Sequence, residues 1–414
     1  MLIDRGQENI GKWQETVNEV EEAIIRRHRE AAREEMRQAY EEVDRKIGGE
    51  MLATGRYVDK GYVRRRIITA VGIVGIRVKR LKRKGRAGSL YPILTAGRVD
   101  TISGPARKRC IQAAVGQSYA ESQKTLETLA GMTISRMGIW KVVQEAGRAE
   151  LRRCEQDRKA MFERGEIPEG CKSSQEKAVI EVDGILIGAR PEVVESQEVA
   201  GRRRMEVKVG VVFCGVHQQS QGRRRTVGRS IHAQISTTEE FAESWYVHCL
   251  KHGIDEQTSV HMLGDGAPWI QTVRRETFPE SRYTLDLCHL RRNARAVLTE
   301  RQYGDFSRRI WSGSGTEMIA YIRALRPSDR LHRKELDTFQ QYLESNREGL
   351  VYRPGKLNGS GVVEKTVDIL VARRMKRRGM SWSKEGANNI IALRALSLNR
   401  ESILWDSRLP SPTF

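Results

Sequence analysis

Apolar residues near the start of the chain recur at the spacing of a helix. The positions that share this 3-4-3-4 spacing are Ile10, Trp13, Val17, Val20 and Ile24, followed after a basic break by Ala32, Met36, Ala39 and Val43. They predict one long amphipathic helix or a helical pair over 5–48, ended by the glycines at 48 and 49. The seam could join two chains or pack on its own chain, and the pattern leaves both open.

Two β-branched runs over 62–84 flank a glycine-containing turn near 71–75 and predict a β-hairpin. The window 56–86 holds twelve Lys or Arg residues, with Asp59 as its one acid. A solvated charge run is one interpretation, but cations interleaved with strand residues favour a hairpin that follows a DNA backbone. The predicted DNA-contacting residues here are Arg64, Arg65, Arg66, Arg77, Lys79, Arg80, Lys82, Arg83 and Lys84.

The next segment, 105–150, has a helical pattern. Residues 118–131 and 132–147 resemble the two helices of a helix-turn-helix, with the turn around Gly131. Helix pairs joined by glycine are also common in proteins that bind no DNA, so base reading stays open. The polar stretch 151–176 contains Gly165, Pro168 and Gly170 and is predicted to be a linker.

Strand patterns begin at 177. The predicted strands are 178–189, 204–215, 224–235, 259–265 and 281–290, with helices after the third and fourth. Three successive strands, a helix and then strand–helix–strand is the order of a ribonuclease-H-like mixed sheet, so we predict an α/β catalytic core of that fold class. Residues 291–355 lack strand patterns and are predicted to be an all-helical insertion.

The predicted organisation therefore has seven parts. They are a helical, possible coiled-coil region (1–55), a basic hairpin region (56–104), a helix-turn-helix-like region (105–150), a linker (151–176), a catalytic domain (177–290 and 356–400), a helical insertion (291–355) and a tail (401–414).

Composition narrows the class of protein. Among 414 residues, Lys plus Arg exceeds Asp plus Glu by 20, which indicates a polyanionic partner. Six scattered cysteines without a CxxC pair argue against a zinc ribbon and a disulfide framework. The chain has no signal-peptide pattern and no run of 18 apolar residues, so we expect a soluble, cytoplasmic, nucleoid-associated protein.

Three acidic residues occur in sequence contexts that are unusual for an acid. Asp183 lies within a run of β-formers, Asp265 ends an apolar strand before a helix, and Glu364 opens a helix after Gly-Ser-Gly. A carboxylate in an apolar strand is costly unless it is paired or binds metal. Acids on adjacent strands and on a helix across them suit two-metal phosphoryl transfer. The sequence therefore predicts that these three hold two Mg²⁺ ions, with Mn²⁺ as an alternative.

Other acids compete for these roles. Glu181 shares a strand face with Asp183 and could be the ligand, although Gly184 favours Asp183 by admitting backbone or substrate. Asp265 could be a turn residue, the commoner fate of Asp-Gly. Asp368, one helical turn after Glu364, could replace or assist it.

Two further groups are candidates. Asp286 and His289 close the fifth predicted strand and are either a satisfied core pair or a pair that orients the scissile phosphate. Cations follow the helix of Glu364 and are either a solvated face or a phosphate clamp. They are Arg373, Arg374, Lys376, Arg377 and Arg378.

Five phrases carry a resemblance to a known family. They are VDG at Asp183, GDGAPWI at Asp265, DLCHL at 286–290, GSGVVE at Glu364, and RMKRRGMSW with the downstream GANNIIALRAL at 386–396. The chain resembles bacterial insertion-sequence transposases of the DDE type, in a group catalogued as an uncharacterised protein family and distantly Mutator-like. The resemblance covers 178–396 well and 56–147 less specifically.

The resemblance implies metal ligation by Asp183, Asp265 and Glu364, and a strand-five motif at Asp286 and His289, where Cys288 is a departure. It also implies an enzyme that binds terminal inverted repeats of double-stranded DNA as a homodimer or higher multimer. Such an enzyme hydrolyses the ends with Mg²⁺ and transfers the 3′-hydroxyls to target DNA. The alternatives are a ribonuclease-H-like nuclease or resolvase without strand transfer, and a domesticated DNA-binding regulator.

Overall fold

The computed structural model describes residues 2–95, 101–194, 196–220, 223–312 and 314–400. The predicted tail, 401–414, lies outside these residues. Contacts divide the chain into two units, with the boundary between Glu145 and Ala146. Helix α5 (Arg136–Arg164) contains that boundary. None of the helices in the described ranges is both long and apolar enough to span a bilayer.

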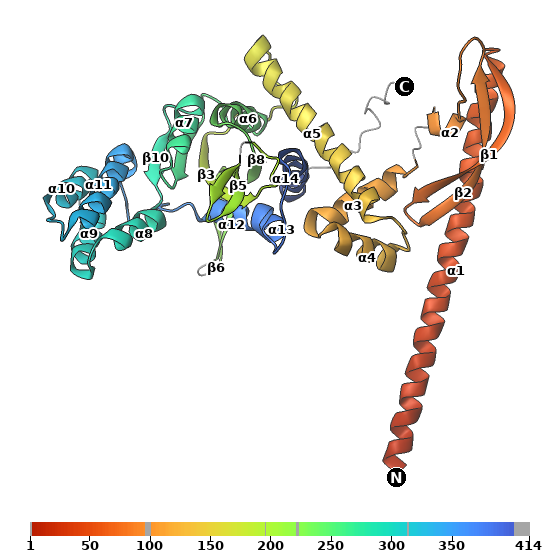
Figure 1. Ribbon diagram of the computed structural model, residues 1–414, viewed down its shortest axis with the longest axis horizontal. Coiled ribbons are helices and arrows are strands. Elements are labelled where there is room, and N and C mark those ends of the chain that lie inside the picture. Colours follow the sequence, from red (N-terminus) through yellow and green to blue (C-terminus); the bar gives the residue numbers. More distant parts are fainter. Residues whose placement is uncertain (1, 96–100, 195, 221–222, 313, 401–414) are drawn as a thin grey trace. The chain divides into compact units, whose positions relative to one another are not determined.

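The first unit joins one long helix to a β-hairpin and a helical group (Figure 1). Its elements are α1 (Leu2–Ala53), β1 (Tyr57–Thr69), β2 (Gly72–Arg83), α2 (Pro92–Thr95), α3 (Gly104–Gly116) and α4 (Tyr119–Ala130).

Helix α1 is a single helix, and it does not end at the two glycines as predicted. A Cβ on Gly48 would lie 3.1 Å from the Lys79 side chain, so the glycine permits close packing on the hairpin without ending the helix. The chain leaves the helix at Gly55, whose φ is +67°. Asp44 fixes the contact, because its carboxylate accepts the backbone N–H groups of Lys79 (2.6 Å) and Ile93 (3.0 Å).

Strands β1 and β2 pair antiparallel from Tyr57↔Arg83 to Thr69↔Gly72, so the turn is Ala70-Val71, slightly earlier than predicted. Buried apolar side chains of the hairpin pack with residues of α1. This cluster contains Ile67, Val74, Ile76, Val78 and Ile93, with Met36 and Tyr40 of α1 against it.

The helix pair after the hairpin has strong end signals. Ser118 and Glu121 form a capping box at the start of α4, and Gly131 ends it in the left-handed conformation. Helix α5 then continues to Arg164, so the first half of the predicted linker (151–176) is helical. Its polar composition reflects surface ion pairs, including Arg153 with Glu150 (2.5 Å) and Arg158 with Glu155 (2.7 Å).

A mixed sheet forms the centre of the second unit. Its strands are β3 (Lys177–Gly188), β4 (Gln197–Val199), β5 (Arg202–Phe213), β8 (Ser230–Gln234), β9 (Ser259–Gly264) and β10 (Arg282–Leu285). The order is β10-β9-β3-β5, and both β4 and β8 pair with β5. Strands β10, β9 and β3 are parallel, whereas β5 is antiparallel to β3 and β8 antiparallel to β5.

The third predicted strand, 224–235, is instead divided at Gly228 (φ +63°). Its first part forms a separate hairpin, β6 (Gly215–Ser220) with β7 (Arg223–Val227), and its second part is β8.

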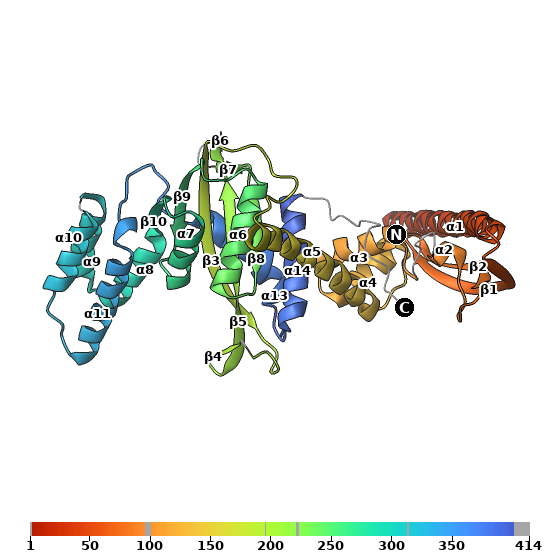
Figure 2. The ribbon, with the colours of Figure 1, turned by 90° about the horizontal axis from the view of Figure 1, so that it is seen from above.

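Helices cover both faces of the sheet (Figures 1 and 2). They are α6 (Thr238–Lys251) and α7 (Pro268–Thr277), then α12 (Gly361–Val367), a π-helical segment (Asp368–Ala372), α13 (Arg373–Met375) and α14 (Lys384–Asn399). Ile180 and Val182 of β3 share a core cluster with Phe241 and Trp245 of α6. Residue 181, on the opposite face, contacts α12.

The predicted insertion is helical. It contains α8 (Leu287–Val297), α9 (Glu300–Ser312), α10 (Gly315–Ala324), α11 (Arg330–Ser345) and a 3₁₀ turn (Arg347–Gly349). The helices start at Leu287, so the fifth strand is shorter than predicted and His289 lies in the first turn of α8. Apolar residues of the insertion, including Phe306 and Phe339, belong to the same core cluster as α6.

Candidate active site

Three aspartates stand side by side on three neighbouring parallel strands: Asp183 lies midway along β3, where its pairing with β9 ends, and Asp265 and Asp286 directly follow β9 and β10. The register pairs Val182 with Gly264 and Leu285 with Gly264. The next residue on each strand is Asp183, Asp265 and Asp286, and the Asp286 N–H donates to the Gly264 carbonyl at 2.8 Å. The fold therefore brings three of the predicted site residues to one level of the sheet.

Asp265 lies in a tight loop that the helical insertion supports. Its Oδ1 accepts the Ala267 N–H at 2.9 Å, and Gly266 has a φ of +87°. The Tyr342 hydroxyl of α11 donates to the Asp265 carbonyl at 2.8 Å. The turn role considered from the sequence is thus present, and Asp265 also stands beside Asp183.

Glu364 reaches the same region from α12, the short helix after the Gly-Ser-Gly loop. Its side chain is 47% exposed, and its Oε1 lies 3.7 Å from His289 Nδ1. The structure therefore places Glu364 beside the strand-end acids, although α11 and the rest of the insertion intervene in sequence.

Asp286 is buried and makes hydrogen bonds through both oxygens. Its Oδ1 accepts the His289 N–H at 2.7 Å and contacts His289 Nδ1 at 3.1 Å. Its Oδ2 accepts from the backbone nitrogen (2.5 Å) and hydroxyl (2.8 Å) of Ser360. Burial raises the pKa of Asp286, but these hydrogen bonds outweigh it and hold the pKa well below its usual range.

Donor atoms of Asp286, His289 and Glu364 lie within 4.8 Å of one another, and within the described part of the chain no other such trio occurs. In the predicted metal set of Asp183, Asp265 and Glu364, the donor atoms therefore do not all lie within 4.8 Å of one another. Asp286 is already saturated by protein donors, and His289 Nδ1 is engaged with it. We interpret this pair as an orienting group.

Asp183 lies in a negative environment. Burial raises its pKa to about 6, the Gly184 N–H opposes this, and the charges of Asp265 and Glu364 raise it further. The hydrogen bond that His289 Nδ1 donates to Asp286 raises the pKa of His289, against the effect of burial. Hard carboxylate oxygens that repel one another are a suitable donor set for Mg²⁺ or Mn²⁺.

Glu181 has a role that the sequence left open. It is fully buried, and its Oε2 accepts the N–H groups of Val362 (2.9 Å) and Val363 (2.8 Å) at the start of α12. Burial raises its pKa to about 7, against those two hydrogen bonds. No local pattern marks this contact, because its partners are remote in sequence.

Among the neighbours of these acids, Asp368 stays an alternative to Glu364, whereas the interpretation of Gly184 needs correction. Asp368 is paired with Arg373 at 2.9 Å and begins the π-helical segment. Gly184 adjoins the Glu206 side chain, whose Oε1 would lie 2.5 Å from an added Cβ. This glycine makes room for a side chain of the sheet, where the sequence suggested backbone or substrate.

Most of the predicted DNA-contacting cations are exposed, but Lys79 and Arg80 are partly buried and Arg374 is buried. Lys79 is 14% exposed and paired with Asp59 at 3.0 Å, and Arg80 is half-buried. Arg374 is 1% exposed and stacks over the Trp382 ring at 5.3 Å. The prediction that Arg374 contacts DNA is wrong for this conformation, because its guanidinium lies within the protein.

Arg394 of α14 was not singled out from the sequence. It donates to the carbonyls of Leu370 (2.5 Å) and Ile369 in the π-helical segment. A π-helix has i→i+5 hydrogen bonds in place of the i→i+4 bonds of an α-helix, and Arg394 gives two carbonyls of this segment a side-chain donor. It thereby supports the segment that follows Glu364.

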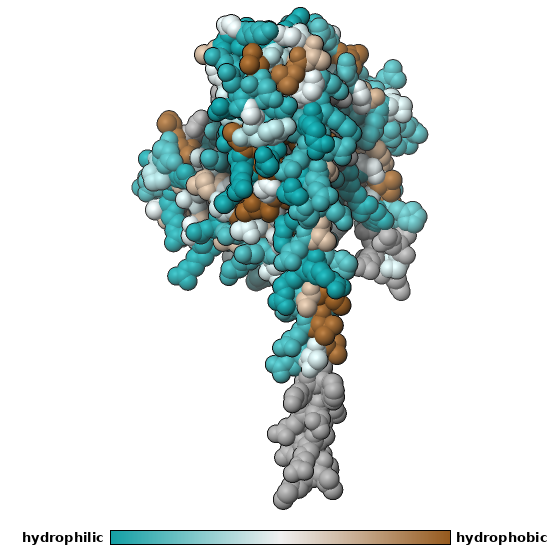
Figure 3. Space-filling view, turned by 90° about the vertical axis from the view of Figure 1, so that its right-hand side faces the viewer, coloured by the Kyte–Doolittle hydropathy of each residue, from teal (hydrophilic) through white to brown (hydrophobic). Residues whose placement is uncertain are grey.

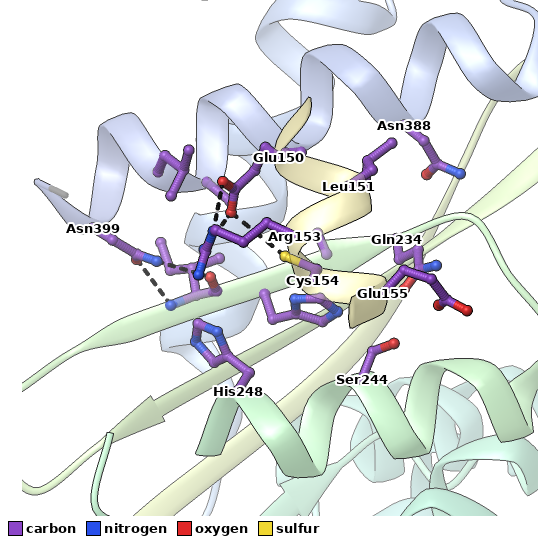
Figure 4. A pocket seen from close by; sticks show the side chains of 16 residues that line it. Glu150, Leu151, Arg153, Cys154, Glu155, Gln234, Ser244, His248, Asn388 and Asn399 are labelled. Carbon is purple, nitrogen blue, oxygen red and sulfur yellow. Dashed lines mark hydrogen bonds and ion pairs between the residues drawn. The ribbon is translucent and has the colours of Figure 1, made fainter. Parts of the chain in front are cut away.

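A separate pocket lies between α5, β8, α6 and α14 (Figure 4). Ser230 Oγ lies 2.9 Å from Nε2 of both His248 and His252. The side chains of Asn388 and Asn399 bond to the backbone of β8 at Ile235 and Ile231 and so cover its free edge. None of the candidate acids lines this pocket, and its polar groups serve the fold.

Comparison with protein families gives a match over nearly the whole chain. The model of the family described as "Uncharacterised protein family (UPF0236)" matches residues 12–406. Proteins of Caldanaerobacter subterraneus subsp. tengcongensis are among the relatives. UPF0236 protein TTE2489 is 22% identical over 89% of this chain and 75% of its own length, and TTE0402 is 22% identical over 87% and 69%.

Solved structures give weaker matches. The Drosophila P element transposase strand transfer complex aligns with 74% of this chain and 82% of its own, at 11% identity and a TM-score of 0.23. NurA bound to dAMP and manganese aligns at 13% identity, over 60% of each chain, with a TM-score of 0.09. TM-scores this low do not show a shared fold.

Proposed function

We propose a function from the premise that this chain belongs to the UPF0236 family, whose model it matches from residue 12 to 406. The chain is a DDE-type DNA transposase, which cleaves the ends of its element and transfers the 3′-hydroxyls to target DNA. The observation that carries the proposal is that Asp183, Asp265 and Asp286 lie side by side at one level of the sheet, with Glu364 next to them.

The sheet supports a ribonuclease-H-like core. Its order β10-β9-β3-β5-β8 places the first strand of the sheet between an antiparallel neighbour and two parallel ones. This is the arrangement expected from the strand order in the sequence. The carboxyl ends of the parallel strands then form the edge where a substrate binds.

Asp183, Asp265 and Glu364 would hold divalent metal. Bound there, two such ions would activate a water or 3′-hydroxyl and stabilise the leaving oxygen of the phosphodiester. The raised pKa of Asp183 supports this assignment, because it reflects burial beside other acids that a cation would relieve. Asp265 is held for this role by Ala267 and Tyr342.

His289 would orient the scissile phosphate. Asp286 fixes its ring through Nδ1, and the raised pKa favours the protonated imidazolium. The Nε2 proton is then free of that bond and available to a phosphate oxygen. Asp286 itself acts as an orienting group, because all its contacts are to protein donors.

DNA binding would use the hairpin and the cations after α12. Arg64, Arg65 and Arg66 on β1 are exposed. Lys376, Arg377 and Arg378 are also exposed and follow the helix that carries Glu364. Contacts with phosphates in both places would use part of the net charge of +20.

Helix α1 would join two copies of the chain. Val17, Val20 and Ile24 are 64%, 54% and 43% exposed at heptad spacing. Apolar side chains lie along one side of the projecting part of the helix in Figure 3. A heptad seam of exposed apolar residues is the pattern through which helices associate into a coiled coil. Ile10 and Trp13 of the predicted seam lie outside the described side chains.

The test is an assay with Mg²⁺ on labelled DNA that carries the sequences flanking the gene. The proposal expects cleavage at the element ends and joined strand-transfer products. Cleavage without joining would instead favour a nuclease or resolvase. Binding without cleavage in Mg²⁺ or Mn²⁺ would contradict the proposal and favour a DNA-binding regulator.

A further inference from the structure

Helix α12 is capped at its N-terminus by a residue from another part of the chain. Its local N-cap residue, Ser360, makes no capping hydrogen bond to the helix, and its hydroxyl instead donates to Asp286. Glu181 of β3 accepts the N–H groups of Val362 and Val363 in its place. The start of the helix is thus tied to a strand of the sheet.

This cap is an unusual use of a carboxylate. Helix N-termini are normally capped by a nearby Ser, Thr, Asp or Asn, which costs little because the site is exposed. Glu181 is fully buried, and its Oε1 has no hydrogen-bond partner among the described residues. Burying an acid with an unmatched oxygen is unfavourable for stability alone, so its position points to a role in the site.

Glu181 connects two candidate ligands by a short path. It lies two residues before Asp183 on the same face of β3. Its hydrogen bond to the Val363 N–H reaches the residue just before Glu364. One side chain therefore couples the strand of Asp183 to the helical turn of Glu364.

Helix α12 needs such support. It has seven residues, and a π-helical segment follows it directly. A helix this short is marginal without tertiary contacts. Asp286 holds Ser360 in front of it, but Glu181 alone bonds to two N–H groups of the first turn, as far as the described contacts go.

We propose that Glu181 is a positioning residue, which holds α12 on β3 so that the carboxylate of Glu364 faces those of Asp183 and Asp265. The inference rests on the proposed function, because it assigns Glu364 to the metal site. Glu181 would touch neither metal nor DNA and would act through the backbone of α12.

The test compares Glu181→Ala, which removes the cap, with Glu181→Gln, whose carbonyl oxygen can still accept both N–H groups. Ser118→Ala is the control, because it removes the side chain that caps α4 in the first unit, where Ser118 Oγ accepts the Glu121 N–H at 3.2 Å. Two properties are measured on the full chain. They are amide hydrogen exchange over 360–367 and the Kd for Mn²⁺ by electron paramagnetic resonance.

For Glu181→Ala we expect faster exchange over 360–367 and a Kd for Mn²⁺ roughly 10- to 100-fold higher. Glu181→Gln should restore the protection and most of the affinity, and Ser118→Ala should change neither. If Glu181→Ala does not fold, Glu181→Asp replaces it, because the shorter side chain withdraws the oxygen from both nitrogens.

Faster exchange with a wild-type Kd would overturn the inference, because Glu181 would then be only a structural cap. A Glu181→Gln variant as weak as Glu181→Ala would also overturn it, since charge rather than position would matter. Glu364→Gln separates the two proposals. If it binds Mn²⁺ like the wild type, the proposed function itself fails, whereas weak binding with an unaffected Glu181→Ala contradicts only the positioning role.

Discussion

Asp286 and Ser360 are joined by two hydrogen bonds to one carboxylate oxygen, across 74 positions of sequence. The bonds link the end of β10 to the loop before α12, and the helical insertion lies between them. A Cβ at Gly359 would lie 3.3 Å from the same oxygen, so the loop passes very close to the strand end. The insertion thus leaves and re-enters the sheet unit at one anchored point.

Replacing Asp286 should destabilise the second unit. Asp286→Asn places an amide NH₂ against N–H donors, and we expect a loss of about 3 kcal/mol in the free energy of unfolding. Urea unfolding measures it. Ser360→Ala removes one of the bonds and should cost about 1 kcal/mol. Equal stability of Asp286→Asn and wild type would contradict the anchoring role.

The pH dependence of this anchor has a definite sign. The folded state depresses the pKa of Asp286, so its contribution is present above the unfolded value of about 4 and is lost as pH falls through the folded pKa. Wild-type stability should therefore fall on acidification below pH about 4 more steeply than that of Asp286→Ala. Parallel pH profiles of the two proteins would exclude this linkage.

Asp183 should show the opposite linkage. Its pKa is raised to about 6, so the folded state binds the proton more tightly and stability falls as pH rises from about 4 to 6. Without metal at pH 8, Asp183→Asn should be more stable than wild type by up to about 3 kcal/mol. Thermal unfolding in a chelator checks the direction, and a less stable variant would contradict it.

Metal affinity should follow the same titration. A ligand must lose its proton to bind metal, so the affinity for Mn²⁺ should fall about tenfold per pH unit below pH 6, where Asp183 becomes protonated. Titrations between pH 5 and 8 measure this, with about 6 as the expected break. A Kd for Mn²⁺ independent of pH would argue that Asp183 is not a ligand.

Exposed and buried cations of the segment after α12 should behave differently. Lys376→Ala and Arg378→Ala should each weaken DNA binding and lower the salt dependence of log K by about 0.9 per lost phosphate contact, without changing Tm. Arg374→Ala should lower Tm, because it removes the buried guanidinium that stacks on Trp382. Fluorescence anisotropy measures DNA binding by the three variants, and thermal unfolding measures their Tm. A lower Tm with unchanged DNA binding for the exposed variants, and the reverse for Arg374→Ala, would contradict the assignment.

Charges in the exposed seam of α1 should separate the copies. Val17→Asp with Val20→Asp places acids at two seam positions and should convert a dimer to a monomer in sedimentation equilibrium. Exposed Glu22, on another side of the helix, provides the matched control as Glu22→Gln. A wild-type chain that is monomeric at all concentrations would exclude the coiled-coil interface.

Local patterns predicted the parts of the fold that depend on local signals. The two β-branched runs over 62–84 predicted the hairpin, and the helical pattern over 118–131 predicted α4. The sequence nominated the acids at 183 and 265 because the first lies within an apolar strand and the second ends one, and the structure places Asp183 within β3 and Asp265 directly after β9. The two acids lie side by side because β3 and β9 pair in parallel, and this pairing agrees with the strand order predicted from the sequence.

The remaining features depend on contacts between distant residues. The glycines at 48 and 49 did not end α1, because packing on the hairpin overrides their low helix propensity. Arg374 belongs to a basic run, yet the ring of Trp382 covers it. Glu181 and Arg394 bond to backbone groups of a segment that no sequence pattern places beside them. The sequence could therefore nominate the acids but could not distinguish ligands from supports.

The most direct measurement is cleavage of end-bearing DNA in Mg²⁺ by Asp183→Asn, Asp265→Asn and Glu364→Gln. Glu385→Gln, an exposed acid of the same unit, is the control. The account predicts that the three variants still bind the DNA but that cleavage and joining are lost, while the control cleaves like the wild type. Cleavage at the wild-type rate by all three variants would contradict the proposed active site.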